Sequence, residues 1–160
     1  SVARDPPRLR RDAEPVELAA LLPRLVEHHR HLLHDKELAV VLDAPTPCTV
    51  HAPPAIVQAA LGNLLRNAIE HSDRGSLRLS LDAATATVTV DDPGHGMSAA
   101  EISALYRRQL RSASRGGIGL DLIQRLCVHL SWQLHIEPRP DGGTRATLRL
   151  ATDGHDTALD

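Results

Sequence analysis

Two asparagines, Asn63 and Asn67, lie one helical turn apart in the segment NLLRNAIEHS. Asparagine is a poor helix former, so two of them at this spacing favour a chemical role. The amide oxygen can bind Mg²⁺ as a neutral, hard ligand, and the amide nitrogen can donate to phosphate. On a helical wheel the polar arc holds Asn63, Arg66, Asn67, Glu70 and His71. Taken alone, the same pattern also fits an amphipathic helix with a solvated polar face.

An acidic pair follows the alternating residues of VTVDDPGHGM. Asp92 of this pair can accept a hydrogen bond from the exocyclic amine of adenine, whereas guanine presents a carbonyl at that position and would be repelled. Gly94 and Gly96 allow a backbone turn with no side chain in the way of a ligand. Strand-ending turns use the same residue types, so this motif is informative only together with others.

A third motif is the glycine-rich segment SRGGIGLDLIQRL, which runs into an apolar helical pattern from Leu120. Free backbone amides at a helix N-terminus bind phosphate well. A flexible loop before a capped helix would look similar. The turn and strand DGGTRATLRL carry little information by themselves.

The elements that must position these motifs follow from periodicity. We expect helices at 16–33, 54–72, 98–109 and 117–130, with Pro23 either kinking the first of them or marking a late start. We expect strands at 37–43 and 48–50 around a proline-containing turn, a hairpin of 77–81 with 86–90, and strands at 132–137 and 145–150. These elements predict an α+β fold, a two-layer sandwich in which helices cover one face of a mixed sheet.

Composition limits the alternatives. A chain of 160 residues with 42% hydrophobic residues is one globular domain with an aliphatic core. A net charge of −2 gives no basic excess for nucleic acid. Cys48 and Cys127 lack metal or redox spacing, and no apolar run reaches the length of a membrane span. We expect 1–13 to be a linker and 151–160 a flexible tail.

The order and spacing of the motifs resemble the catalytic ATP-binding domain of bacterial two-component sensor histidine kinases, within the wider superfamily of gyrase and Hsp90 ATPases. NLLRNAIEHS is similar to the N box of that family, DDPGHGM to its G1 box, GGIGLDL to its G2 box and GGTRATLRL to its closing G3 strand. ALYRR, at 104–108, resembles an altered F box. The resemblance covers residues 14–150, which we therefore expect to be the catalytic domain with the Bergerat ATP-binding fold.

The resemblance implies ATP and Mg²⁺ as cofactors. It makes Asn67 the principal Mg²⁺ ligand, with Asn63 supporting it, and Asp92 the acceptor for adenine. Arg107, in a lid from about Ser98 to Arg115, would reach the terminal phosphate. The remaining nucleotide-binding residues that it implies are Glu70, His71, Gly94, Gly96, Tyr106, Gly117, Gly119, Leu120 and Thr144.

The sequence departs from the family pattern at several positions. Glu70 stands where many members carry a cation near the phosphates. The F box lacks Phe. Pro93 replaces the usual Asn, and Asp121 replaces a Gly that frequently follows the position of Leu120. Asn67 and Asp92 are unaffected. We therefore expect nucleotide binding to survive more surely than catalysis.

Asn63 separates the branches of the superfamily. The ATPases of the superfamily carry a glutamate one turn before the metal-binding asparagine, and an amide cannot replace that base. A kinase would instead pass the phosphoryl group to another domain. Within the chain, His34-Asp35 is a near match to a phosphoacceptor, but it lacks the following Pro and precedes a strand. We expect the acceptor to lie on a domain before Ser1. His28 and His31 could hold a metal, although a solvated helix face fits them better.

The expected partners are the dimerisation and histidine phosphotransfer domain of the same kinase and a response regulator, without nucleic acid. The expected location is a cytoplasmic domain of an inner-membrane sensor, with any membrane contact made by other parts of the protein. Two alternatives stay open. One is an anti-sigma-factor-type serine/threonine kinase, and the other is a nucleotide-sensing module without competent catalysis.

Overall fold

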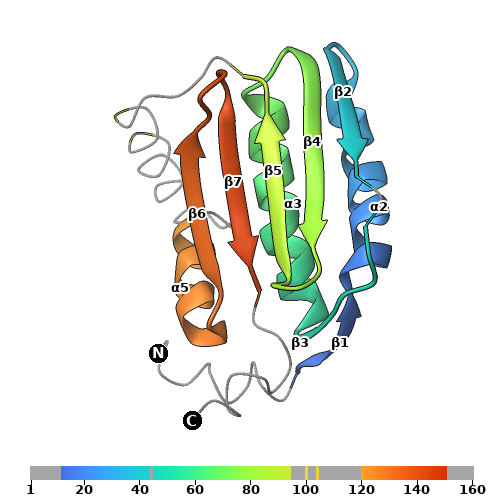
Figure 1. The fold of residues 1–160 in the computed structure, drawn as a ribbon, viewed down its shortest axis with the longest axis vertical. Helices are drawn as coiled ribbons and strands as arrows, with labels where there is room; N and C mark the ends of the chain where they lie inside the picture. The colour runs from blue at the N-terminus through green and yellow to red at the C-terminus, as the bar shows by residue number, and fades with distance from the viewer. Residues whose placement is uncertain (1–11, 44, 95–99, 101–103, 105–119, 151–160) are drawn as a thin grey trace.

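A five-stranded mixed sheet is the centre of the computed structural model, which describes residues 12–43, 45–94, 100, 104 and 120–150 (Figure 1). The strand order is β2-β4-β5-β7-β6. The strands are β2 (Glu37–Leu42), β4 (Arg74–Asp82), β5 (Thr87–Asp92), β6 (Gln133–Pro138) and β7 (Thr144–Arg149). β2 pairs with β4 in parallel, and the other neighbours are antiparallel. The expected hairpin of 77–81 with 86–90 is therefore confirmed, as is the mixed character of the sheet.

Helices cover one face of the sheet, as Figure 1 shows. They are α2 (Leu18–His29), α3 (Pro54–Glu70) and α5 (Leu120–Leu130), with a 3₁₀ turn, η2 (Arg30–Leu33), after α2. Along β5, the side chains of Val88, Val90 and Asp92 point to this face and are buried. The core is aliphatic, and the expected α+β two-layer sandwich is confirmed. Among the described residues, no helix is long and apolar enough to cross a membrane.

The first helix begins later than the periodicity predicts. Val16 lies in a short strand, β1 (Glu14–Glu17), which pairs with β3 (Thr49–Ala52) outside the main sheet. The Glu17 carboxylate fixes this start, because the amides of Ala19 and Cys48 both donate to its Oε1, at 2.9 and 2.8 Å. These hydrogen bonds lower the pKa of Glu17. Pro23 does not end the helix, since α2 continues through it.

The two strands expected around the proline-containing turn do not pair with each other, because β2 joins the main sheet and β3 pairs with β1. Helix 54–72 is confirmed as α3, two residues shorter at its end. The expected helix 98–109 lies outside the described residues apart from Ala100 and Ala104, and so do residues 117–119 of the last expected helix. Cys48 and Cys127 are both buried free thiols.

Candidate functional site

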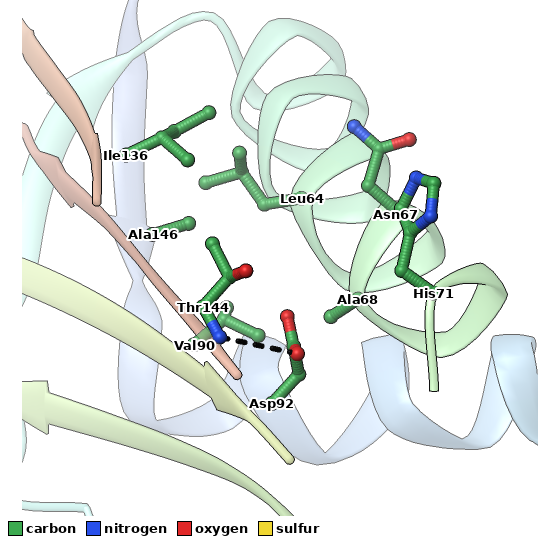
Figure 2. A pocket seen from close by; sticks show the side chains of 9 residues that line it. All are labelled: Leu64, Asn67, Ala68, His71, Val90, Asp92, Ile136, Thr144 and Ala146. Carbon is green, nitrogen blue, oxygen red and sulfur yellow. Dashed lines mark hydrogen bonds between the residues drawn. The ribbon is translucent and has the colours of Figure 1, made fainter. Parts of the chain in front are cut away.

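An open pocket lies between α3 and the ends of the central strands (Figure 2). Its empty volume is about 370 Å³, part of it open to solvent. It is lined by Leu64, Asn67, Ala68, His71, Val90, Asp92, Ile136, Thr144 and Ala146. Its walls are thus mainly aliphatic, with a few polar groups, as is usual for a small-molecule site.

Part of the polar lining of this pocket comes from the C-terminal end of α3. Asn67 is half-buried, and its Nδ2 donates to Oδ1 of Asn63 at 3.1 Å. Asn63 is only 5% exposed, so the polar arc of the wheel is not uniformly solvated. Packing against the rest of the fold determines which residues of this polar arc are exposed to solvent, and the helical wheel alone does not predict it. The hydrogen bond sets the plane of the Asn67 amide and turns its oxygen away from Asn63.

Asp92 is the buried acid of the pocket, with 5% of its surface exposed. Its Oδ1 accepts hydrogen bonds from the backbone amides of Gly94, at 2.9 Å, and Thr144, at 3.3 Å. Figure 2 shows the carboxylate pointing into the pocket between Thr144 and Ala68. Burial raises the pKa of Asp92, while these two backbone hydrogen bonds act in the opposite direction. A buried acceptor with one oxygen already bonded to the backbone suits a ligand that brings its own N–H donor.

Two glycines allow the backbone to pass close to Asp92. A Cβ on Gly94 would lie 2.5 Å from the carbonyl oxygen of His71, so the turn after β5 contacts the end of α3 directly. Gly143 has φ +88°, and a Cβ there would overlap the carbonyl oxygen of Asp92. The sequence singles out Gly94, but it gives no reason to select Gly143.

The structure brings together six of the residues expected from the sequence, one of which is Asn63, bonded to Asn67. Asn67, His71, Asp92 and Thr144 line one pocket, and Gly94 donates to Asp92. Glu70, the last residue of α3, is exposed and does not line the pocket. Of Leu120, only its place as the first residue of α5 is described. The expected residues that lie outside the described part are Gly96, Tyr106, Arg107, Gly117 and Gly119.

The apolar lining was missed by motif reasoning. Leu64 and Ala68 come from α3, each one residue beyond Asn63 and Asn67 respectively. Val90, Ile136 and Ala146 face inward from three neighbouring strands. The alternation of the strands is the signal that could have found them, since every second residue points toward α3. Their chemistry fits a flat apolar ring better than a charged ligand.

Similarity to known proteins agrees with this geometry. The model of the family of histidine kinase-, DNA gyrase B- and HSP90-like ATPases matches residues 53–154. The chain belongs to this family. The motifs of α3, of the β5 end and of β7 that form the pocket all fall within the matched range, and the expectation of a nucleotide-binding domain is confirmed.

Curated relatives in this ATPase family are sensor kinases. Sensor histidine kinase GtrS of Pseudomonas aeruginosa is 28% identical over 142 residues, covering 87% of this chain and 29% of GtrS. Sensor protein CreC of Escherichia coli is 30% identical over 143 residues, covering 84% of this chain and 30% of CreC. The chain thus spans less than a third of the length of either relative.

Among solved structures, the ATP binding domain of PrrB from Mycobacterium tuberculosis superposes with a TM-score of 0.70 and 26% identity, covering 89% of this chain and 99% of that domain. The catalytic domain of histidine kinase ThkA reaches a TM-score of 0.73 at 16% identity, which shows the common fold. The ATPase-family fold therefore accounts for nearly the whole chain.

The histidines of the N-terminal part form no comparable site. His34 and Asp35 lie 3.8 Å apart, and both side chains are largely exposed directly after η2. In the part of the chain that the structure describes, no three side chains of His, Cys, Asp or Glu are grouped so as to hold a metal ion. The solvated-surface interpretation of His28 and His31 thus remains the simpler one.

Proposed function

We propose that this chain is the ATP-binding catalytic domain of a two-component sensor histidine kinase, which transfers the γ-phosphoryl group of ATP to a histidine on a separate domain. The observation that carries the proposal is the pair of carboxamides, Asn67 and Asn63, beside the pocket of Asp92. A nucleotide pocket whose neighbouring helix carries an amide in place of a base favours transfer to a side chain over hydrolysis. The names of the curated relatives support the same assignment.

Within this proposal, adenine occupies the aliphatic pocket and its exocyclic amine donates to the Asp92 carboxylate. The ring would lie against Leu64, Ala68 and Ile136, with His71 and Thr144 at its edges. Guanine would place a carbonyl oxygen against a carboxylate, which is repulsive. The pocket should therefore select ATP over GTP.

The donor set fits Mg²⁺ with one protein ligand. Nδ2 of Asn67 donates to Asn63, and Asn67 would present its amide oxygen to the ion. Mg²⁺ in nucleotide sites takes one or two protein oxygens, with waters and phosphate oxygens completing its shell. When bound, the ion would neutralise charge on the phosphates. Asn63 holds the ligand in place, and Asn67 presents it.

The remaining residues of the proposed site lie in or beside the lid. We assign Arg107 to the terminal phosphate, with Tyr106 beside it, and Gly96 to the adenine pocket. We place Gly117, Gly119 and Leu120 along the phosphates. Residues 14–150 form the proposed catalytic domain, between a linker at 1–13 and a flexible tail at 151–160.

The proposed partners are the dimerisation and phosphoacceptor domain of the parent kinase and a response regulator. The proposed location is the cytoplasmic side of an inner-membrane sensor protein. The similarity to named sensor histidine kinases favours this function over an anti-sigma-factor-type kinase or a sensing module without catalysis.

Trans-phosphorylation tests the proposal. The chain is mixed with a histidine-containing dimerisation domain, from the parent protein or a similar sensor kinase, together with radiolabelled ATP and Mg²⁺. We expect label on that domain that is labile to acid and stable to base, and none with Asn67→Ala. Acid-stable label on serine would instead identify the anti-sigma-factor type. Nucleotide binding without any transfer would identify a sensing module.

A further inference from the structure

Behind the pocket, a charged cluster surrounds the end of β5. Asp91 precedes Asp92, so its side chain lies on the sheet face away from the helices. It stands in register with Arg145 of β7, whose Nε donates to Oδ1 of Asp91 at 2.6 Å and whose Nη2 donates to Oδ2 at 3.5 Å. The Asp91 side chain is only 14% exposed, so this ion pair is partly shielded from solvent.

Arg139 connects this cluster to Asp92. Its Nη1 donates to the main-chain oxygen of Asp92 at 2.9 Å, and its Nε lies 3.8 Å from Oδ1 of Asp91. The Arg139 side chain is itself only 25% exposed. The Arg139 guanidinium thus donates to the main chain of Asp92 through Nη1, while the carboxylate of Asp91 lies near its Nε.

The turn that carries Arg139 also contacts Asp92 in two other ways. The turn is closed by hydrogen bonds from the Arg139 amide to the Gly143 carbonyl, at 3.0 Å, and from the Gly142 amide to the Arg139 carbonyl, at 3.1 Å. Gly143 packs against the carbonyl of Asp92, and the Thr144 amide donates to its carboxylate. The β6–β7 turn therefore fixes both the main chain and the side chain of Asp92.

We propose that Arg139 is a positioning residue for base recognition, which holds the main chain of Asp92 so that its carboxylate meets the exocyclic amine of adenine. The inference rests on the proposed function, in which Asp92 binds adenine. Arg139 does not line the pocket, so it acts through Asp92 and not through the base. Asp91, itself held by its ion pair with Arg145, attracts the guanidinium to this face of the strand.

A positioning role has a selective signature. Releasing the main chain of Asp92 should weaken the hydrogen bond to the adenine amine, because hydrogen bonds depend steeply on distance and angle. It should leave the apolar contacts and the phosphate contacts unchanged. Purine riboside triphosphate lacks the exocyclic amine and otherwise resembles ATP. Its affinity should therefore not depend on where the Asp92 carboxylate lies.

The test compares the dissociation constants of ATP and purine riboside triphosphate, with Mg²⁺, for wild type and Arg139→Gln. We expect Arg139→Gln to weaken ATP by roughly tenfold, the size of one charge-assisted hydrogen bond, and the analogue much less. Arg149→Gln is the matched control, since Arg149 is an exposed arginine on the same hairpin, opposite Thr87 instead of Asp91. It should leave both affinities unchanged.

The possible outcomes distinguish a failure of this inference from a failure of the proposed function. If wild type prefers ATP and Arg139→Gln keeps the same ratio, Arg139 has only a structural role and the inference is wrong. If wild type binds both nucleotides equally, Asp92 does not bind the exocyclic amine. In that case both the proposed adenine site and the inference about Arg139 are wrong. Should Arg139→Gln not fold, Asp91→Asn loosens Arg139 without removing it, and the ATP preference should fall in the same direction.

Discussion

Nδ2 of Asn67 donates to Oδ1 of Asn63 across 3.1 Å, one turn earlier on α3. The two amides have different surroundings, because Asn67 lines the pocket while Asn63 is buried, with only 5% of its surface exposed. We therefore expect different roles for them. Asn67→Ala should abolish Mg²⁺-dependent phosphoryl transfer while the variant still folds, since Asn67 is only half-buried and its loss opens no core cavity. The loss of its hydrogen bond to Asn63 should lower the thermal unfolding midpoint modestly. Phosphotransfer assays and circular dichroism melts of the same preparations measure the two effects.

Asn63→Ala should behave differently from Asn67→Ala. It removes a buried hydrogen-bonding partner, so it should cost about 1–3 kcal/mol of unfolding free energy and also reduce activity by releasing Asn67. Full activity in Asn67→Ala, or unfolding of that variant at room temperature, would show that Asn67 has been placed on the wrong face of the helix. Equal melting curves for the two variants would contradict the difference in burial.

The ionisation of Asp92 should govern the pH dependence of binding. Burial raises its pKa above the ordinary value of 3.8, and the ionised form accepts a stronger, charge-assisted hydrogen bond from the adenine amine than the protonated form does. ATP affinity should therefore fall as the pH drops through the raised pKa, before exposed aspartates titrate. Calorimetric titrations of ATP between neutral and mildly acidic pH follow this loss. In Asp92→Asn, the loss in this pH window should be absent.

The same raised pKa predicts a stability effect. A carboxyl group whose pKa is raised on folding stabilises the fold fully below its unfolded pKa, and it loses that contribution as the pH rises through the folded pKa. At neutral pH, the buried charge of Asp92 is therefore a cost. Asp92→Asn should keep the bonds from Gly94 and Thr144, match or exceed the wild-type melting temperature, and bind ATP about tenfold more weakly or worse. A large loss of melting temperature would contradict this account.

Adjacent glycines of the β6–β7 turn provide a matched pair. Both have positive φ, +100° for Gly142 and +88° for Gly143, but a Cβ on Gly142 meets nothing within 4 Å, whereas one on Gly143 overlaps Asp92. Gly142→Ala should cost only backbone strain, on the order of 1 kcal/mol. Gly143→Ala should cost distinctly more and also impair ATP binding. Urea unfolding and ATP titration of both variants check the order, and equal losses would refute the close contact.

The fold was largely predictable because its signals are local. The alternation of 77–81 and 86–90 and the apolar arc of α3 appear directly in the sequence and were confirmed. The start of α2 was not predictable, since it depends on the Glu17 carboxylate bonding Cys48, a residue far along the chain. For the same reason, sequence reasoning could not find Gly143 or Arg139, whose contacts with Asp92 exist only once β5 and β7 pair.

Glu70 tests the electrostatics of the proposed phosphate side. It is exposed at the end of α3, and among the described residues no ion pair joins it to Arg66. We propose that its charge weakens the triphosphate, since two unit charges at ~4 Å interact by about 4 kcal/mol at an effective dielectric of 20 before Mg²⁺ and solvent offset it. Glu70→Lys should then tighten ATP more than ADP at fixed Mg²⁺. An unchanged ratio of the two affinities would remove Glu70 from the site.

The central claim is that the pocket of Asp92 binds adenine selectively. Calorimetric titration of the wild-type chain with ATP and with GTP, each with Mg²⁺, tests this claim most directly. Because a buried acceptor that faces the wrong partner costs about 1–3 kcal/mol, GTP should bind roughly tenfold more weakly than ATP, or worse. Equal affinities, or no detectable binding of ATP, would contradict the account.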